Sequence, residues 1–138
     1  MLKSITLKNY RGFDEHTIDF QDKNILIGKN NAGKSTIVEA IRIISIVTHR
    51  YTRLNYLDSP LELRKHTSSP GIRPSLSKLD IDLTHACHQY QDPPSIIEAV
   101  FTTNQKIRIF LLADNSIFCV LYDKKGRVVR DKRSALSA

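Results

Sequence analysis

Residues 28–35 read GKNNAGKS and match the pattern G-x-x-x-x-G-K-[ST] at every fixed position. This motif constrains the fold more than any other feature, because it brings a run of backbone N–H groups, an ammonium and a hydroxyl around a triphosphate and Mg²⁺. Residues 24–27 (NILI) predict a short buried strand before the loop, and a long apolar stretch follows it. The order strand, loop, helix is the context that the motif requires, so the sequence predicts a nucleotide site.

Each position of the loop has an expected role. Gly28 lets the chain leave the strand sharply, and Gly33 lets the backbone approach a phosphate with no Cβ in the way. The N–H groups of residues 30–34 are expected to point into one concavity at the positive end of the following helix. Lys34 is expected to reach the β- and γ-phosphates, Thr36 to donate to the α-phosphate, and Ser35 to bind Mg²⁺.

The predicted ATP-binding residues of the loop are Gly28, Asn30, Asn31, Ala32, Gly33, Lys34, Ser35 and Thr36. The alternative is a turn rich in Gly and Asn that only caps a helix and leaves Lys34 in solvent. We favour the nucleotide site because the whole pattern and both flanks agree.

The hydrophobic pattern predicts an α/β fold. Alternation of apolar and polar residues indicates strands around Ile5 and Leu7 and again from His16 to Phe20. A helix is expected over residues 34–48, with apolar residues on most faces, beneath a central sheet. An antiparallel meander is predicted from three strand-like runs of residues, 96–102, 106–113 and 116–122. A turn at 123–126 and a short strand-like run at 127–129 follow it.

The middle of the chain is the least regular part. Residues 51–63 are expected to be partly helical, 67–74 form a loop by composition, and 79–83 alternate as a short strand. The chain therefore reads as one domain over 1–138, with strands, loop and helix in 1–49 and the meander in 96–130. Residues 50–95 are predicted to be an irregular insertion or a loop beside the site.

The chain is basic, with a net charge of +7 over 138 residues. Its 41% hydrophobic and 25% charged residues are ordinary for a soluble globular domain. Six cations cluster near the end: Lys124, Lys125, Arg127, Arg130, Lys132 and Arg133. They suit a nucleic-acid backbone, but a solvated strand edge or a frayed terminus is the interpretation we favour.

Cysteine usage indicates a reducing, cytoplasmic environment, because Cys87 and Cys119 lie far apart with no C-x-x-C motif. His85, Cys87 and His88 suggest a metal site, but zinc requires four ligands and no second pair is visible, so none is predicted. The most apolar stretch, 37–47, is too short to span a bilayer, and we expect no membrane partner.

Three segments of the chain resemble a known family: SITLKNYRGF, IDF and NILIGKNNAGKSTIVEAI. They are similar to the N-terminus of the ABC-type ATPases of the SMC, RecF and OLD (overcoming lysogenization defect) group, especially OLD-like and related AAA-type ATPases. The close match covers residues 1–48, and 96–129 resembles the antiparallel sheet of the same lobe more loosely. The resemblance implies a P-loop ATPase N-terminal lobe that binds ATP and Mg²⁺. It also places Arg11 near the nucleotide, where the alternative is a surface arginine beside a turn glycine.

The resemblance further implies DNA as a partner, a role in DNA repair or anti-phage defence, and pairing with a second copy or a partner ATPase lobe. Three family features are not found: the signature motif, the Walker B Asp-Glu and the switch histidine. The nearest Walker B candidate, 117–123 (IFCVLYD), has Lys124 in place of the catalytic Glu, and Asp-Lys-Lys-Gly favours a hairpin turn. Glu39 lies on the loop's own helix and is not expected to replace that Glu.

No catalytic residue is therefore predicted in this chain. It is expected to be an incomplete lobe whose hydrolysis requires a missing C-terminal lobe. A second hypothesis is a truncated, non-catalytic homologue that binds protein or nucleic acid. A GTPase or a small-molecule kinase is disfavoured, because no N/T-K-x-D guanine motif occurs and neither suits the antiparallel meander.

Overall fold

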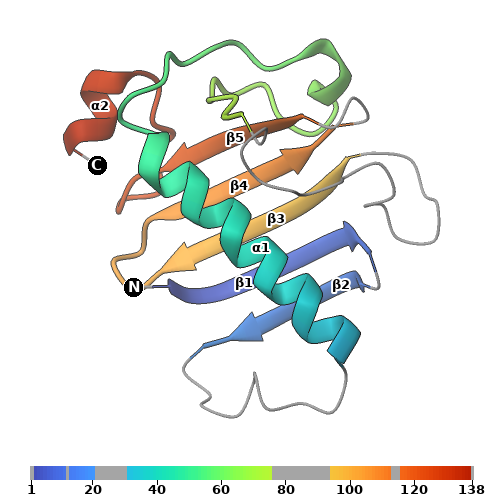
Figure 1. The fold of residues 1–138 in the computed structure, drawn as a ribbon. Coiled ribbons are helices and arrows are strands. Elements are labelled where there is room, and N and C mark those ends of the chain that lie inside the picture. The colour runs from blue at the N-terminus through green and yellow to red at the C-terminus, as the bar shows by residue number, and fades with distance from the viewer. Residues whose placement is uncertain (1, 12, 21–30, 76–93, 113–115, 138) are drawn as a thin grey trace.

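The fold is a five-stranded antiparallel sheet with one long helix across a face, seen in a computed structural model (Figure 1). The structure describes residues 2–11, 13–20, 31–75, 94–112 and 116–137. The strands are β1 (Leu2–Tyr10), β2 (Phe13–Asp19), β3 (Ser95–Phe101), β4 (Lys106–Leu111) and β5 (Ile117–Tyr122). The helices are α1 (Asn31–Arg50), the short 3₁₀ helix η2 (Leu61–Leu63) and α2 (Lys132–Ser137). This architecture fits part of an α/β ATPase lobe.

The predicted meander is confirmed, since β3, β4 and β5 pair in sequence order as antiparallel neighbours. The sheet order is β2-β1-β3-β4-β5, so β1 lies between its own hairpin partner and the first strand of the meander. Ile5 pairs with Ile18 on one side and with Ala99 on the other. The predicted strand at 24–27 lies outside the described residues.

Helix α1 is 20 residues long and extends beyond the predicted 34–48 at both ends. Its β-branched residues have low helix propensity, but burial against the sheet compensates for it. Ile37, Ala40, Ile44 and Val47 are all buried at a helical spacing, in one core cluster with the strand residues that face them. Val38 is 50% exposed, so the expectation of burial on most faces is wrong for this side of the helix.

Residues 51–75 run along the edge of β5 that does not pair with β4 (Figure 1). The Ile72 N–H donates to the Cys119 carbonyl at 2.9 Å, and the Cys119 N–H donates back at 2.8 Å. Helical structure within the predicted 51–63 is limited to η2, where Leu63 is buried with Phe110 and Phe118. This segment follows the C-terminal end of α1, about 30 Å along the helix from its first turn. The described part of 50–95 therefore begins at the end of α1 that is remote from the loop.

The chain after β5 forms the predicted hairpin turn. Asp123 accepts hydrogen bonds from the N–H groups of Lys125 and Arg127, both at 2.9 Å, and Val128 pairs with Tyr122. These two N–H groups lower the pKa of the Asp123 carboxyl, that of Arg127 most. Asp123 therefore caps a turn, as favoured over the Walker B alternative.

Candidate nucleotide-binding site

The described part of the GKNNAGKS motif forms the start of α1. Gly28 and Asn30 lie outside the described residues, whereas the backbone of Asn31, Ala32, Gly33 and Lys34 forms the first turn. N–H groups of a first helical turn have no carbonyl partner within the helix and carry the positive end of its dipole. This end of α1 therefore has the backbone arrangement that an anion site requires.

The two hydroxyl residues of the motif follow in the next turn. Ser35 is exposed and Thr36 is half-buried. A serine hydroxyl is the hard oxygen ligand that Mg²⁺ accepts beside phosphate oxygens. The accessibility of Ser35 at the start of the helix is consistent with its predicted role.

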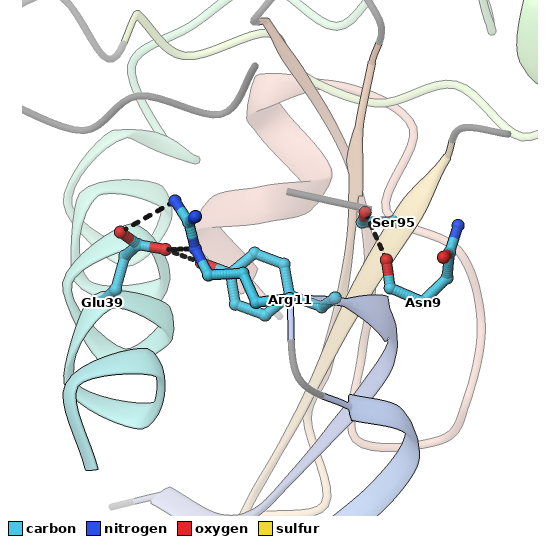
Figure 2. Close-up of polar contacts among 5 residues, drawn as sticks. Asn9, Arg11, Glu39 and Ser95 are labelled. Carbon is cyan, nitrogen blue, oxygen red and sulfur yellow. Dashed lines mark hydrogen bonds and ion pairs between the residues drawn. The ribbon is translucent and has the colours of Figure 1, made fainter. Parts of the chain in front are cut away.

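Arg11 binds Glu39 of α1 through both carboxylate oxygens (Figure 2). Arg11 Nε donates to Glu39 Oε1 at 2.7 Å, and Nη2 donates to Oε2 at 3.2 Å. The two side chains are 28% and 21% exposed. Glu39 lies four residues after Ser35, so both project from the same side of α1, one turn apart. The structure thus places the guanidinium of Arg11 beside the early turns of the loop's helix.

Tyr10 completes this cluster. It is fully buried at the end of β1, and its hydroxyl donates to Glu39 Oε1. Burial and the neighbouring carboxylate raise the pKa of Tyr10, so the phenol stays protonated and remains a donor. Burial alone would lower the pKa of Arg11, but its bonds to Glu39 and Tyr10 outweigh burial and raise it. The cluster is therefore a cation, a carboxylate and a neutral phenol.

The backbone that carries Tyr10 is held on its other side by β3. Ser95 Oγ donates to the Asn9 carbonyl at 2.5 Å (Figure 2). Asn9 Nδ2 donates to the Pro94 carbonyl at 3.2 Å. Asn9 and Arg11 both have positive φ, at 51° and 52°. Asn tolerates this left-handed region, whereas Arg rarely adopts it, so the strain lies at Arg11. Such strain is concentrated at functional sites.

Sequence reasoning singled out Arg11 but missed its partners. Nothing local connects residues 10 and 11 with residue 39, because the contact depends on how α1 crosses the sheet. The one available signal was the spacing of Glu39 from Ser35, which a helix converts into a shared face.

The family model described as an AAA ATPase domain matches residues 1–131 of this chain. The chain belongs to this family. A protein from Exiguobacterium sp. named DNA replication and repair protein RecF is 41% identical over 54 residues, covering 38% of this chain and 14% of that protein. Proteins of the same name from Bacillus cytotoxicus and Bacillus thuringiensis are each 29% identical over 98 residues, covering 57% of this chain and 26% of theirs.

The chain is thus an N-terminal region of an SMC/RecF-like AAA-type ATPase, and it spans between 14% and 26% of the length of these relatives. An AAA ATPase domain binds nucleotide, in keeping with the loop motif. Across the described ranges, no group of three or more His, Cys, Asp or Glu side chains is arranged to hold a metal ion. The suggested cluster of His85, Cys87 and His88 lies outside them.

The six cations near the end of this AAA domain are all exposed. They occupy the turn after β5, the stretch paired with it and helix α2, and only Arg127 forms an ion pair with another described residue, Asp123 at 3.2 Å. Val129, between these cations, and Ala135, just after them, are buried in the main core, so the segment is anchored to the sheet and is not frayed. No helix within the described part of the chain combines the length and apolar content needed to cross a membrane.

Proposed function

We propose that this chain is the ATP–Mg²⁺-binding lobe of a RecF-like P-loop ATPase. The observation that carries the proposal is the GKNNAGKS motif, which is complete in the sequence and whose described residues begin α1, in a chain that belongs to the AAA ATPase domain family. The N–H groups of the first turn and Lys34 would hold the phosphates, and Ser35 would bind Mg²⁺. Thr36 and Arg11 complete the proposed contacts.

Hydrolysis by this lobe is proposed to require groups from elsewhere. Of the two acids considered for this role, Glu39 is bound to Arg11 and Tyr10, and Asp123 caps a turn. Phosphoryl transfer needs a residue that orients the attacking water and a second metal contact. We propose that a further lobe, and a second copy or partner subunit, supplies them.

Titration with a fluorescent ATP analogue, mant-ATP, tests the proposal directly. The purified chain should bind it saturably in the presence of Mg²⁺, unlabelled ATP should displace it, and EDTA should weaken binding. Release of phosphate should be negligible in the same preparation. Absence of saturable binding would refute the nucleotide site, and rapid turnover would show that a catalytic acid is present.

DNA is the second proposed partner, and the names of the RecF relatives favour a role in DNA repair over anti-phage defence. The observation that supports a contact in this chain is the exposed basic segment between residues 124 and 133. It lies beyond β5, near the end of α1 remote from the loop (Figure 1). This separation allows the DNA contact and the nucleotide site to be tested independently.

Charge removal in this segment should weaken DNA binding. The double variant Lys124→Gln/Lys125→Gln should lower affinity for a duplex and reduce the slope of log affinity against log salt by about 0.9 for each phosphate that is no longer neutralised. The matched control is Arg64→Gln/Lys65→Gln, which removes the same charge from two exposed neighbours near η2. Fluorescence anisotropy at several salt concentrations measures the affinity and its salt dependence for each variant. Equal losses of affinity in the two variants would mean that the effect comes from net charge alone and not from a contact at this segment.

A further inference from the structure

We propose that Glu39 is a positioning residue of the nucleotide site, which holds the Arg11 guanidinium in one orientation toward the phosphates of the bound nucleotide. This inference rests on the proposed function. It assigns a role to the one acid of α1, whose side chain meets the chain at the end of β1.

The geometry of the pair fixes the plane of the guanidinium. Nε and Nη2 are on the same edge of the group, and each donates to a different oxygen of Glu39, at 2.7 and 3.2 Å. A two-point contact of this kind prevents rotation that a single hydrogen bond would allow. Two of the five N–H donors of Arg11 are thereby committed to Glu39, and the opposite edge of the guanidinium faces away from it.

The backbone of the turn is shaped to bring two consecutive side chains to the same carboxylate. Neighbouring residues of a strand project to opposite faces of a sheet. Tyr10 and Arg11 nevertheless both reach Glu39, and the positive φ of Arg11 accounts for the departure from strand geometry (Figure 2). Ser95 holds the preceding carbonyl of Asn9, so the turn is fixed from both sides.

Stability alone does not explain this arrangement. An ion pair that solvent still reaches contributes little to the stability of the fold, and partial burial of its two charges opposes folding. The positive φ of Arg11 opposes it further. A second carboxylate offers the comparison: Glu98 of β3 binds Lys106 at 2.8 Å and Arg108 at 3.4 Å between regular strands, with no positive φ in either strand. Asn104, in the turn between β3 and β4, also has a positive φ, of 70°, which Asn tolerates. Among the described residues, Arg11 is the one residue other than Asn or Gly with a positive φ, and it lies in the cluster that touches the loop's helix.

The test is a double-mutant cycle read by mant-ATP affinity with the purified chain. Glu39→Gln keeps the size of the side chain but removes its charge and one acceptor, and Arg11→Ala removes the guanidinium. Each should lower mant-ATP affinity by about tenfold, the effect of one charge-assisted contact. The double variant Arg11→Ala/Glu39→Gln should bind no more weakly than Arg11→Ala alone, because Glu39 acts through Arg11.

Glu98→Gln is the matched control, since its side chain is 15% exposed and also binds cations. It should leave mant-ATP affinity unchanged even where thermal unfolding shows a loss of stability. Unchanged affinity in Glu39→Gln, or losses that add in the double variant, would overturn the inference while wild-type binding upholds the site itself. Failure of the wild-type chain to bind mant-ATP would overturn both.

Discussion

Lys34→Ala is expected to lower the affinity for ATP by roughly a hundredfold or more. The lysine lies in the first turn of α1, where an ammonium would meet the β- and γ-phosphates beside the backbone N–H groups. Removing it leaves the helix dipole and the N–H groups in place, so residual binding of the phosphates should persist only at high concentration. Titration with mant-ATP measures the change, and the thermal melting curve should be nearly the same as that of the wild-type chain.

Lys8→Ala is the control for a general loss of positive charge. Lys8 lies on β1, and its ammonium is 3.9 Å from Glu15 on the neighbouring strand, with the side chain 41% exposed. An exposed pair at that distance contributes little to stability, and Lys8 has no predicted contact with nucleotide. Similar ATP affinity in wild type and Lys34→Ala would remove the assignment of the loop, whatever Lys8→Ala shows.

The parts of the fold that depend on local pattern were predictable. The meander follows from three strand-like runs, 96–102, 106–113 and 116–122, with predicted turns between them at 103–105 and 114–115, all of which are encoded within a few residues. The second of these turns lies outside the described residues. Helix α1 was predictable because a phosphate loop is followed by a helix, although its β-branched residues argue against one. The hairpin turn at Asp123 was predictable from the turn chemistry of Asp and Gly.

The parts that depend on long-range contact were not predictable. β1 pairs with β3 across more than eighty residues, and no local signal selects that partner. The hydrogen bonds between Ile72 and Cys119 join residues 67–74, which are predicted to be a loop from their composition, to the edge of the sheet. The contact of Arg11 with Glu39 depends on the crossing of α1 over β1, so the residue was found by resemblance and its partner only by geometry.

Gly71→Ala should destabilise the fold more than any other small substitution in the described segment 51–75. A Cβ at residue 71 would lie 2.0 Å from the Cys119 carbonyl oxygen and 2.9 Å from Phe118 Cζ. The oxygen belongs to the backbone of a central stretch of β5 and cannot move without breaking strand pairing. Gly71 also exchanges two hydrogen bonds with Leu57, at 2.7 and 2.9 Å. The whole edge segment must therefore shift to admit one methyl group.

The expected loss in the free energy of unfolding is about 3 kcal/mol, which lowers the melting temperature by about 10 °C in a domain of this size. Gly126→Ala is the control, because it makes the same substitution in the turn after β5. A Cβ there meets nothing within 4 Å, and only the positive φ of 82° opposes it. Its expected loss is about 1 kcal/mol. Thermal and urea unfolding of the two variants separates steric overlap from backbone strain, and equal losses would mean that residues 71–72 are not packed on β5.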